Sequence, residues 1–390
     1  MNKKNMGLTR RNFVKSSVLT GIGAIIATQT NASINSLAGL AKPTTNIADA
    51  LKYPRTAMSL PGLFPGKVTE VFHPGSVVEK KISMEVVNDM LTKAMLDLTG
   101  SRKIDEAWAM FVKPGEKIGL KINPVAGKDL STSLELVKVV IGQLENAGIS
   151  KDDIIIWDRR EFEMNEIGYT NENFPGIKIT GTECKDEKGS FVDANGKLYG
   201  EERIDKNWFY WADVEGKYDA ETLPYMVNEG KNSYFTKICT EMVDKIINIP
   251  ILKNAGASVT LCMKNLAYGA ISNTGRLHEQ LWADTCAEVC AFPPIRDKVV
   301  LNIVDGLIGC YQGGPAANPQ FITNFNMLLV GTDPVAVDRI GYEIILQKRI
   351  EENIQKEESP RGRTFMDMAE KLQLGVADIK KIKHKKIKLA

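Results

Sequence analysis

The chain of 390 residues is poor in the two residue types that most often bind transition metals, with 3 histidines and 6 cysteines. The histidines stand alone in the sequence, no HExxH motif is present, and no two cysteines have the two-residue spacing of a zinc knuckle. The run of four closely spaced cysteines typical of iron–sulfur proteins is also absent. Six cysteines are too few for a disulfide scaffold in a chain of this length, so burial of apolar side chains must stabilise the fold.

Two cysteines and one histidine form a weak metal-binding pattern. Cys286 and Cys290 are four residues apart, on one face of a predicted helix, and His278 lies about two turns earlier. They are candidates for a soft metal ion, although two cysteines packed in a core give the same spacing. Dinucleotide, P-loop and GxSxG motifs are missing beyond residue 41. The cofactor therefore stays unassigned, with a metal ion as one candidate.

The first 41 residues contain five positive charges, all at or before Lys15, no acidic residue, and an apolar run at 18–27. This layout is typical of a signal peptide. The adjacent Arg10 and Arg11, with Phe13 and Lys15 after them, form the pattern that the twin-arginine translocase recognises. We therefore expect export of the folded protein to the periplasm or another extracytoplasmic space, with the translocase as a partner.

No apolar run is long enough to cross a bilayer core of about 30 Å, which favours a cleaved signal over a permanent membrane span. Removal of residues 1–41 would change the formal net charge from +2 to −3, which argues against nucleic-acid binding. The lysine-rich segment 380–388 has two interpretations. It is either a surface for polyanions or an exposed edge strand guarded by lysines.

The remaining chain alternates between strand and helix patterns. Residues 42–67 read as a linker or surface arm, and 68–390 as a single α/β domain. Residues 117–122 and 154–157 read as strands around a helix at 133–147, for which Thr132 and Glu135 form a predicted capping box.

Further strands are predicted at 246–252, 259–263, 299–304 and 327–330, and a helix at 334–350 is capped by Asp333. The pattern predicts an α/β fold with three layers, a mostly parallel, doubly wound sheet and helices on both faces. Residues 160–243 lack periodicity and are rich in aromatic side chains, so they are predicted to form a large insertion or lid.

Polar side chains follow the predicted strands. Ligands of open α/β sheets bind beyond the carboxyl ends of the strands, so these residues are candidates for one site. The candidate acids, bases or metal ligands are Asp158, Asp305 and Asp333; the candidate substrate-binding residues are Lys121, Asn123, Lys253, Asn254, Lys264 and Asn265. Ordinary turns, helix caps and lysines at the rim of the sheet would produce the same pattern.

Several of these segments resemble the family called domain of unknown function 362. They are 120–124, 247–253, 259–266, 303–306 and 331–338, within about 115–345. The resemblance implies an α/β fold and places Lys121, Lys253, Lys264, Asp305, Asp333 and Asp338 at the family's recurrent positions. Some relatives carry an added iron–sulfur domain, whose cysteines this chain lacks.

These observations support two hypotheses about function. The first is a cofactor- or metal-dependent enzyme, with redox chemistry as one option, that acts on a small anionic substrate held by the lysines. The second is a non-catalytic carrier or maturation protein that binds a metal or cofactor. Export in the folded state suits both, because a ligand can be inserted before transport.

Export should depend on the arginine pair, because lysine does not reproduce the geometry of a guanidinium group. We expect the double substitution Arg10→Lys and Arg11→Lys to leave the precursor in the cytoplasm, as measured by cell fractionation and immunoblotting. Substitution of Lys3 and Lys4 by arginine is the control and should leave export unchanged. Normal export of the Arg10 and Arg11 variant would show that another pathway is used.

Overall fold

The computed structural model describes residues 42–215 and 231–390, and Thr44–Ala390 form one compact unit. The predicted signal peptide, with Arg10 and Arg11, lies outside the described residues. The segment 216–230, within the predicted insertion, also lies outside them.

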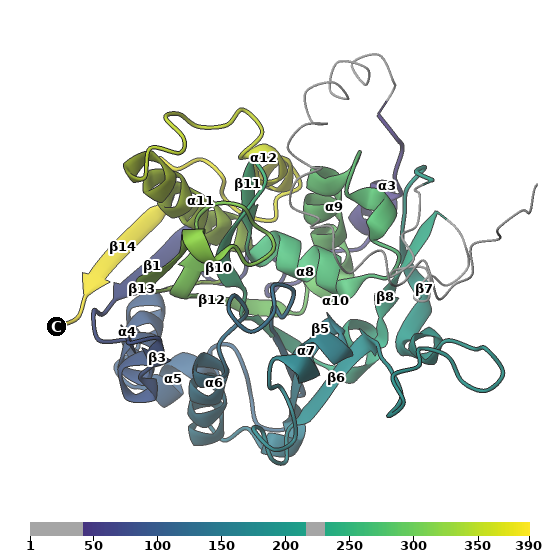
Figure 1. Ribbon diagram of the computed structural model, residues 1–390, viewed down its shortest axis with the longest axis horizontal. Coiled ribbons are helices and arrows are strands. Elements are labelled where there is room, and N and C mark those ends of the chain that lie inside the picture. Colours follow the sequence, from purple (N-terminus) through teal and green to yellow (C-terminus); the bar gives the residue numbers. More distant parts are fainter. Residues whose placement is uncertain (1–41, 216–230) are drawn as a thin grey trace, which may run out of the picture. The chain divides into compact units, whose positions relative to one another are not determined.

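A sheet to which the described residues contribute ten strands lies at the centre of this unit (Figure 1). Eight strands follow the spatial order β14-β1-β13-β12-β9-β4-β5-β6, while β10 and β11 branch from β12. Their bounds are β1 Lys67–Phe72, β4 Ile118–Lys121, β5 Ile154–Arg160, β6 Lys178–Glu183, β9 Lys245–Asn248, β10 Ile251–Ala255, β11 Ser258–Thr260, β12 Val299–Cys310, β13 Ile322–Gly331 and β14 Lys383–Lys388.

Most neighbouring strands in this sheet run in the same direction. The antiparallel pairs are β1 with β13, β12 with β13, and β10 with β11. The other pairings, including the series β12-β9-β4-β5-β6, are parallel. The predicted α/β fold with a mostly parallel sheet is therefore confirmed.

Helices cover both faces of the sheet, as Figure 1 shows. One face packs against α4 (Met84–Thr99), α5 (Ile104–Ala109) and α6 (Leu134–Asn146), and the other against α8 (Cys262–Ala270), α9 (Trp282–Glu288), α11 (Pro334–Glu351) and α12 (Thr364–Lys371). Alternation along β5 explains the two cores: Ile154 and Ile156 face the first group, whereas Ile155 and Trp157 face the second. Shorter helices are α3 (Ile47–Leu51), α7 (Glu161–Glu166) and α10 (Pro293–Arg296).

Both predicted long helices are present, but one predicted cap is wrong. Asp333 caps α11 as expected, because its carboxylate accepts the backbone N–H of Ala336 at 2.9 Å. Helix α6 begins after Ser133 and has no side-chain cap, so the predicted capping box of Thr132 and Glu135 does not form. The Thr132 hydroxyl donates instead to the Ile249 carbonyl oxygen at 2.7 Å, which ties the start of α6 to the end of β9.

The segment 246–263 differs most from the prediction. The single strand expected at 246–252 is two strands, β9 and β10, separated by Ile249 and Pro250; proline has no N–H for a sheet ladder. The strand expected at 259–263 ends at Thr260 in β11, and α8 begins at Cys262. Helix α8 can begin there because the buried Asp338 carboxylate accepts the N–H groups of Cys262 and Met263, at 2.6 and 3.0 Å.

The segment predicted as an insertion contributes to two sheets. Strand β6 extends the central sheet beside β5, whereas β7 (Ile204–Trp211) and β8 (Asn232–Thr236) form a separate antiparallel pair. Another short hairpin consists of β2 (Val77–Val78) and β3 (Lys81–Ile82).

The lysine-rich β14 is an edge strand that pairs in parallel with β1, as one of the two interpretations predicted. Within residues 42–215 and 231–390, no helix has both the length and the apolar character needed to cross a membrane.

The core position of Ile155 can be tested by truncation. Ile155→Ala should lower the free energy of unfolding by about 2 to 5 kcal/mol, because it removes buried surface and leaves a cavity. Thermal unfolding followed by circular dichroism measures this as a lower Tm. Ile379→Ala is a matched control, since Ile379 is 38% exposed. Equal Tm values for the two variants would contradict the proposed packing of β5.

Candidate functional site

The carboxyl ends of three parallel strands meet beside α8. Lys121, the last residue of β4, lies in register with Trp157 of β5 and with Asn248, the last residue of β9. This alignment is the reason that residues far apart in the sequence form one site. The structure brings together Lys121, Asn123, Asp158, Lys253, Lys264 and Asn265, all predicted as site residues.

Lys121 is fully buried at this junction and has a complete set of hydrogen-bond acceptors. Its ammonium group forms an ion pair with Asp158 and donates to the Ile122 carbonyl oxygen at 2.7 Å and to Asn265 Oδ1 at 2.9 Å. Burial lowers the pKa of Lys121, and the Asp158 carboxylate opposes this shift. Since both charges are compensated within the protein, this pair is suited to holding the strand ends in place.

A chain of asparagine side chains extends from this pair across the sheet. Asn123 donates to Asn265 Oδ1 at 3.0 Å, Asn265 to Asn248 Oδ1 at 2.8 Å, and Asn248 to Asn302 Oδ1 at 2.9 Å. Asn302 in turn donates to the carbonyl oxygens of Gly331 and Thr332. We call Asn123, Asn265, Asn248 and Asn302 the amide chain. It links β4, α8, β9 and β12 through side chains that are at most 3% exposed.

Asn248 and Asn302 were not among the predicted site residues. Both interrupt apolar strand sequences, at 246–252 and 299–304. A buried amide without partners is costly, so an asparagine within such a run indicates a hydrogen-bonded role. That signal was available in the sequence, but it does not identify the partners.

One end of the amide chain opens into a small cavity. Lys253 of β10 is fully buried and donates to Asn123 Oδ1 at 2.9 Å. Together with Lys264 of α8 it lines a pocket of about 110 Å³, which we call the lysine cavity. Its other polar lining residues are Asn123, Asp158, Arg159, Arg160, Thr260, Asn265, Tyr268 and His278.

The two lysines lack the carboxylate that neutralises Lys121. Among the described residues, no carboxylate forms an ion pair with Lys253 or Lys264. Burial lowers the pKa of Lys253 to about 7, and the neighbouring positive charge of Lys264 adds to this effect. Burial also lowers the pKa of Lys264. Lys253 therefore changes its protonation state near neutral pH.

His278 also lines the lysine cavity. Its ring lies 4.5 Å from that of Tyr268, and its Nδ1 is 3.0 Å from the Thr274 carbonyl oxygen. Burial lowers the pKa of His278 to about 4, and the charges of Lys264 and Arg159 add to this shift. The imidazole is consequently neutral at physiological pH.

Three other predicted residues do not line this cavity. Asp305 lies within the long strand β12, where alternation directs it toward α6. It accepts hydrogen bonds from the N–H and hydroxyl of Ser133, at 2.8 and 2.6 Å.

Asp333 follows β13, which runs antiparallel to β12 and so ends in the opposite direction from β4, β5 and β9. It also accepts the N–H groups of Gly66 and Val376. The Asn254 amide donates to the carbonyl oxygens of Gly256 and Ser258 and so closes the turn between β10 and β11.

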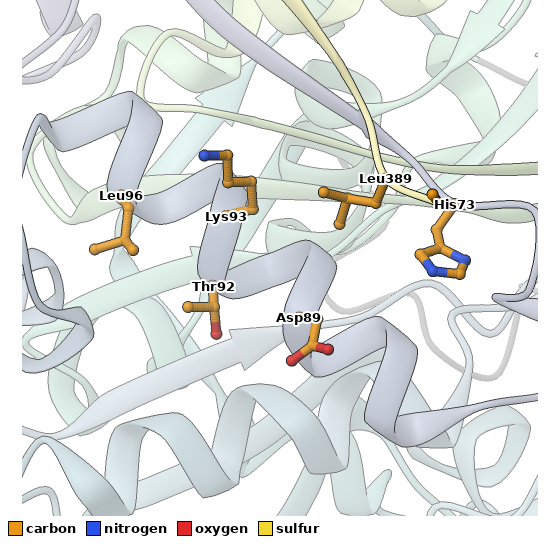
Figure 2. Close-up of a pocket in the computed structure, with 7 residues that line it drawn as sticks. His73, Asp89, Thr92, Lys93, Leu96 and Leu389 are labelled. Carbon is orange, nitrogen blue, oxygen red and sulfur yellow. The ribbon is translucent and has the colours of Figure 1, made fainter.

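Asp305 lines a second pocket, of about 520 Å³, together with Lys80, Lys128 and residues at the start of α6. A third pocket, of about 360 Å³, lies along α4, and Figure 2 shows three of its lining residues, Asp89, Thr92 and Lys93, on this helix. His73 and Leu389 line its other side, and none of the predicted site residues does.

The weak metal candidates are divided between the cavity and the core. His278 lines the cavity, whereas Cys286 and Cys290 are fully buried in the core beside α8, and the Cys290 thiol donates to the Met263 carbonyl oxygen. Burial raises the pKa of both thiols, which disfavours the thiolate form that binds metals. In the part of the chain that the structure describes, no three His, Cys, Asp or Glu side chains are grouped as a metal site.

Comparison with known proteins supports part of the predicted resemblance. Residues 212–343 match the model of the family described as domain of unknown function 362 (DUF362), a range that includes Asn248, Lys253, Lys264 and Asn302. Among solved structures, one similar chain is a Thermotoga maritima protein from a structural genomics programme, with 10% sequence identity and a TM-score of 0.37. The similarity covers 68% of this chain and 59% of that protein, so the match spans less than two thirds of its length. No curated protein matches the chain.

The space occupied by Lys121 depends on a glycine in α8. A Cβ at position 269 would overlap Cε of Lys121 and would lie 2.7 Å from its Nζ. Gly269→Ala should therefore lower the free energy of unfolding by about 1 to 3 kcal/mol, measured by chemical denaturation, because the ion-paired lysine cannot move without losing its partners.

Gly142 provides the matched control for this prediction. It lies within α6, and a Cβ there would have no neighbour within 4 Å. Gly142→Ala should leave stability unchanged or raise it by up to about 1 kcal/mol, through higher helix propensity. Stabilisation by both substitutions would show that Lys121 is not held where the structure places it.

Proposed function

We propose that this protein is an exported enzyme that acts on a small anionic substrate bound in the lysine cavity. The observation that carries the proposal is Lys253, a fully buried amine that lines a cavity and has an amide oxygen, not a carboxylate, as its described partner. Lysine is almost never fully buried without a counter-charge or a specific task. A substrate carboxylate would supply the missing partner.

The charges around the cavity favour an anion. Lys253, Lys264 and Arg159 contribute cationic groups to the lining, and the Asp158 carboxylate, which also lines the cavity, is already paired with Lys121. Arg159 shares the Glu183 carboxylate with Arg160, so its charge is only partly compensated. A buried charge is stabilised mainly by a close opposite charge, and an anionic ligand can provide one here.

The cationic side chains, Lys253 and the hydrogen-bonded network behind them would then have different roles. Lys264, Arg159 and protonated Lys253 would hold the anion, and the neutral form of Lys253, which can lose its proton near neutral pH, would be the reacting group. The Lys121–Asp158 pair and the amide chain would position Asn123 and, through it, Lys253. Asp305 and Asp333, which we expected to act as acid or base, have no part in this proposal because they do not line the cavity.

We also propose export by the twin-arginine route, on the basis of the N-terminal sequence. Intact-mass and metal analysis of protein purified from the exported fraction would show whether a metal or cofactor is transported with it. A tightly bound group without any turnover of small carboxylates would favour the carrier function instead.

Anion binding can be tested with acetate, a small carboxylate that has no reactive carbonyl group. Isothermal titration calorimetry should show binding that weakens as the pH rises through about 7, because Lys253 then loses its charge. Lys253→Met should weaken binding at pH 6 by several-fold to a thousand-fold, equivalent to about 1 to 4 kcal/mol, and should reduce the dependence on pH.

Lys128→Met is the control for this experiment. Lys128 is an exposed lysine that lines the second pocket, so its loss should leave acetate binding unchanged. If Lys128→Met weakened binding and Lys253→Met did not, the anion site would lie beside Asp305. Absence of acetate binding to the wild-type protein would contradict the proposed function.

A further inference from the structure

We propose that Lys253 forms a reversible imine with the carbonyl group of a small oxo acid, whose carboxylate is held by Lys264 and Arg159. This inference rests on the proposed function and specifies its substrate class. The argument depends on the contrast between two buried lysines that share one site, Lys121 and Lys253.

The contrast lies in their hydrogen bonds. Lys121 has an acceptor for each of its three N–H groups, one of them the Asp158 carboxylate, so its ammonium form is held firmly. For Lys253, the described residues provide one acceptor, Asn123 Oδ1, and no ion pair. The nitrogen of Lys253 is therefore positioned by one hydrogen bond, its other N–H groups have no acceptor among the described residues, and the residue lines the cavity.

The surroundings also favour the neutral, nucleophilic amine. A lysine becomes a nucleophile when an apolar environment or a neighbouring cation lowers its pKa, and both effects act on Lys253. With a pKa of about 7, Lys253 is neutral in part of the molecules at neutral pH, unlike an exposed lysine. Lys264 has two effects here, because its charge lowers the pKa of Lys253 and would also attract the substrate carboxylate.

The reaction requires no oxidant or reductant. The lone pair of the neutral Lys253 nitrogen attacks the carbonyl carbon, a C–N bond forms, and the carbonyl oxygen takes up a proton to give a carbinolamine. The oxygen then leaves as water together with both hydrogens of the amine, and a C=N bond remains. Protonation of this imine would withdraw electrons from the neighbouring carbon atoms and so assist cleavage of a bond to them. Hydrolysis reverses the sequence.

The cavity restricts the size of the oxo acid. A volume of about 110 Å³ accommodates only a compact molecule. The cations and the amine line the same small space, so the carboxylate and the carbonyl group must be close together in the substrate. A short-chain 2-oxo or 3-oxo acid meets these requirements.

Reductive trapping tests the proposal directly. The full mature protein is incubated with pyruvate and sodium cyanoborohydride, and intact mass and peptide mapping locate the product. We expect one adduct per chain, on Lys253, with the added mass of pyruvic acid less one oxygen atom. Lys253→Met should lose this adduct, and Lys264→Met should slow its formation at least tenfold. Lys128→Met should behave like the wild type.

A second measurement does not depend on any variant folding correctly. Acetate should protect wild-type Lys253 from trapping, and acetone, which has a carbonyl group but no carboxylate, should react more slowly than pyruvate. Adducts spread over exposed lysines, without protection by acetate, would overturn the inference. If acetate bound at Lys253 but pyruvate were not trapped there, the imine would be ruled out and the proposed function would stand. If neither ligand bound, both would fail.

Discussion

The buried ion pair between Lys121 and Asp158 is the interaction on which the other contacts of the site depend. Two charges removed from water are costly unless each has close partners, and here the pair obtains them from the end of β4 and from Asn265 of α8. Gly269 leaves the space through which the lysine side chain reaches Asp158. The position of α8 over the strand ends is therefore coupled to this pair. Because Lys264 belongs to the same helix, the position of the cavity lining is coupled to it as well.

The amide chain extends this order across the sheet. A primary amide both donates and accepts, so successive asparagines can be linked from one strand to the next without introducing charge. Asn265 occupies the branching point, since its oxygen accepts from Lys121 and Asn123 while its nitrogen donates to Asn248. This arrangement also fixes the rotamer of Asn123, whose nitrogen donates to Asn265 and whose oxygen must then face Lys253. The amine at the cavity is thus oriented by contacts that begin several strands away.

Periodic patterns in the sequence predicted the fold well and the site only in part. Strand β5 and helix α11 were evident because their apolar spacing and the Asp333 cap are local signals. The grouping of Lys121 and Asp158 followed from the rule that parallel strands end at one edge of the sheet, whereas Lys253 lies within β10 and not at a strand end. That rule failed for Asp333, because the antiparallel direction of β13 depends on pairing with distant strands. The rule also failed for Asp305. Strand β12 continues to Cys310 and does not end at residue 304, so Asp305 lies within the strand and its side chain points to the face covered by α6. The break between β9 and β10, in contrast, has a local signal that the prediction did not use, because Pro250 has no N–H for a sheet ladder.

The two central lysines differ in how far the cost of their burial is compensated. For Lys121 the Asp158 carboxylate offsets part of the cost of burial. For Lys253 the pKa falls from 10.5 to about 7, so the folded state binds the proton less tightly than the unfolded chain does. Below pH 7 both states are protonated, and burial of the charge lowers the free energy of unfolding by its full amount. Between pH 7 and 10.5 the folded state has released the proton whereas the unfolded chain keeps it, so the free energy of unfolding rises with pH. The scaffold must offset this cost through the two apolar cores on either side of the sheet. The retention of this destabilising amine, oriented by an ion pair and four asparagines, is one reason for proposing that Lys253 is a reactive group.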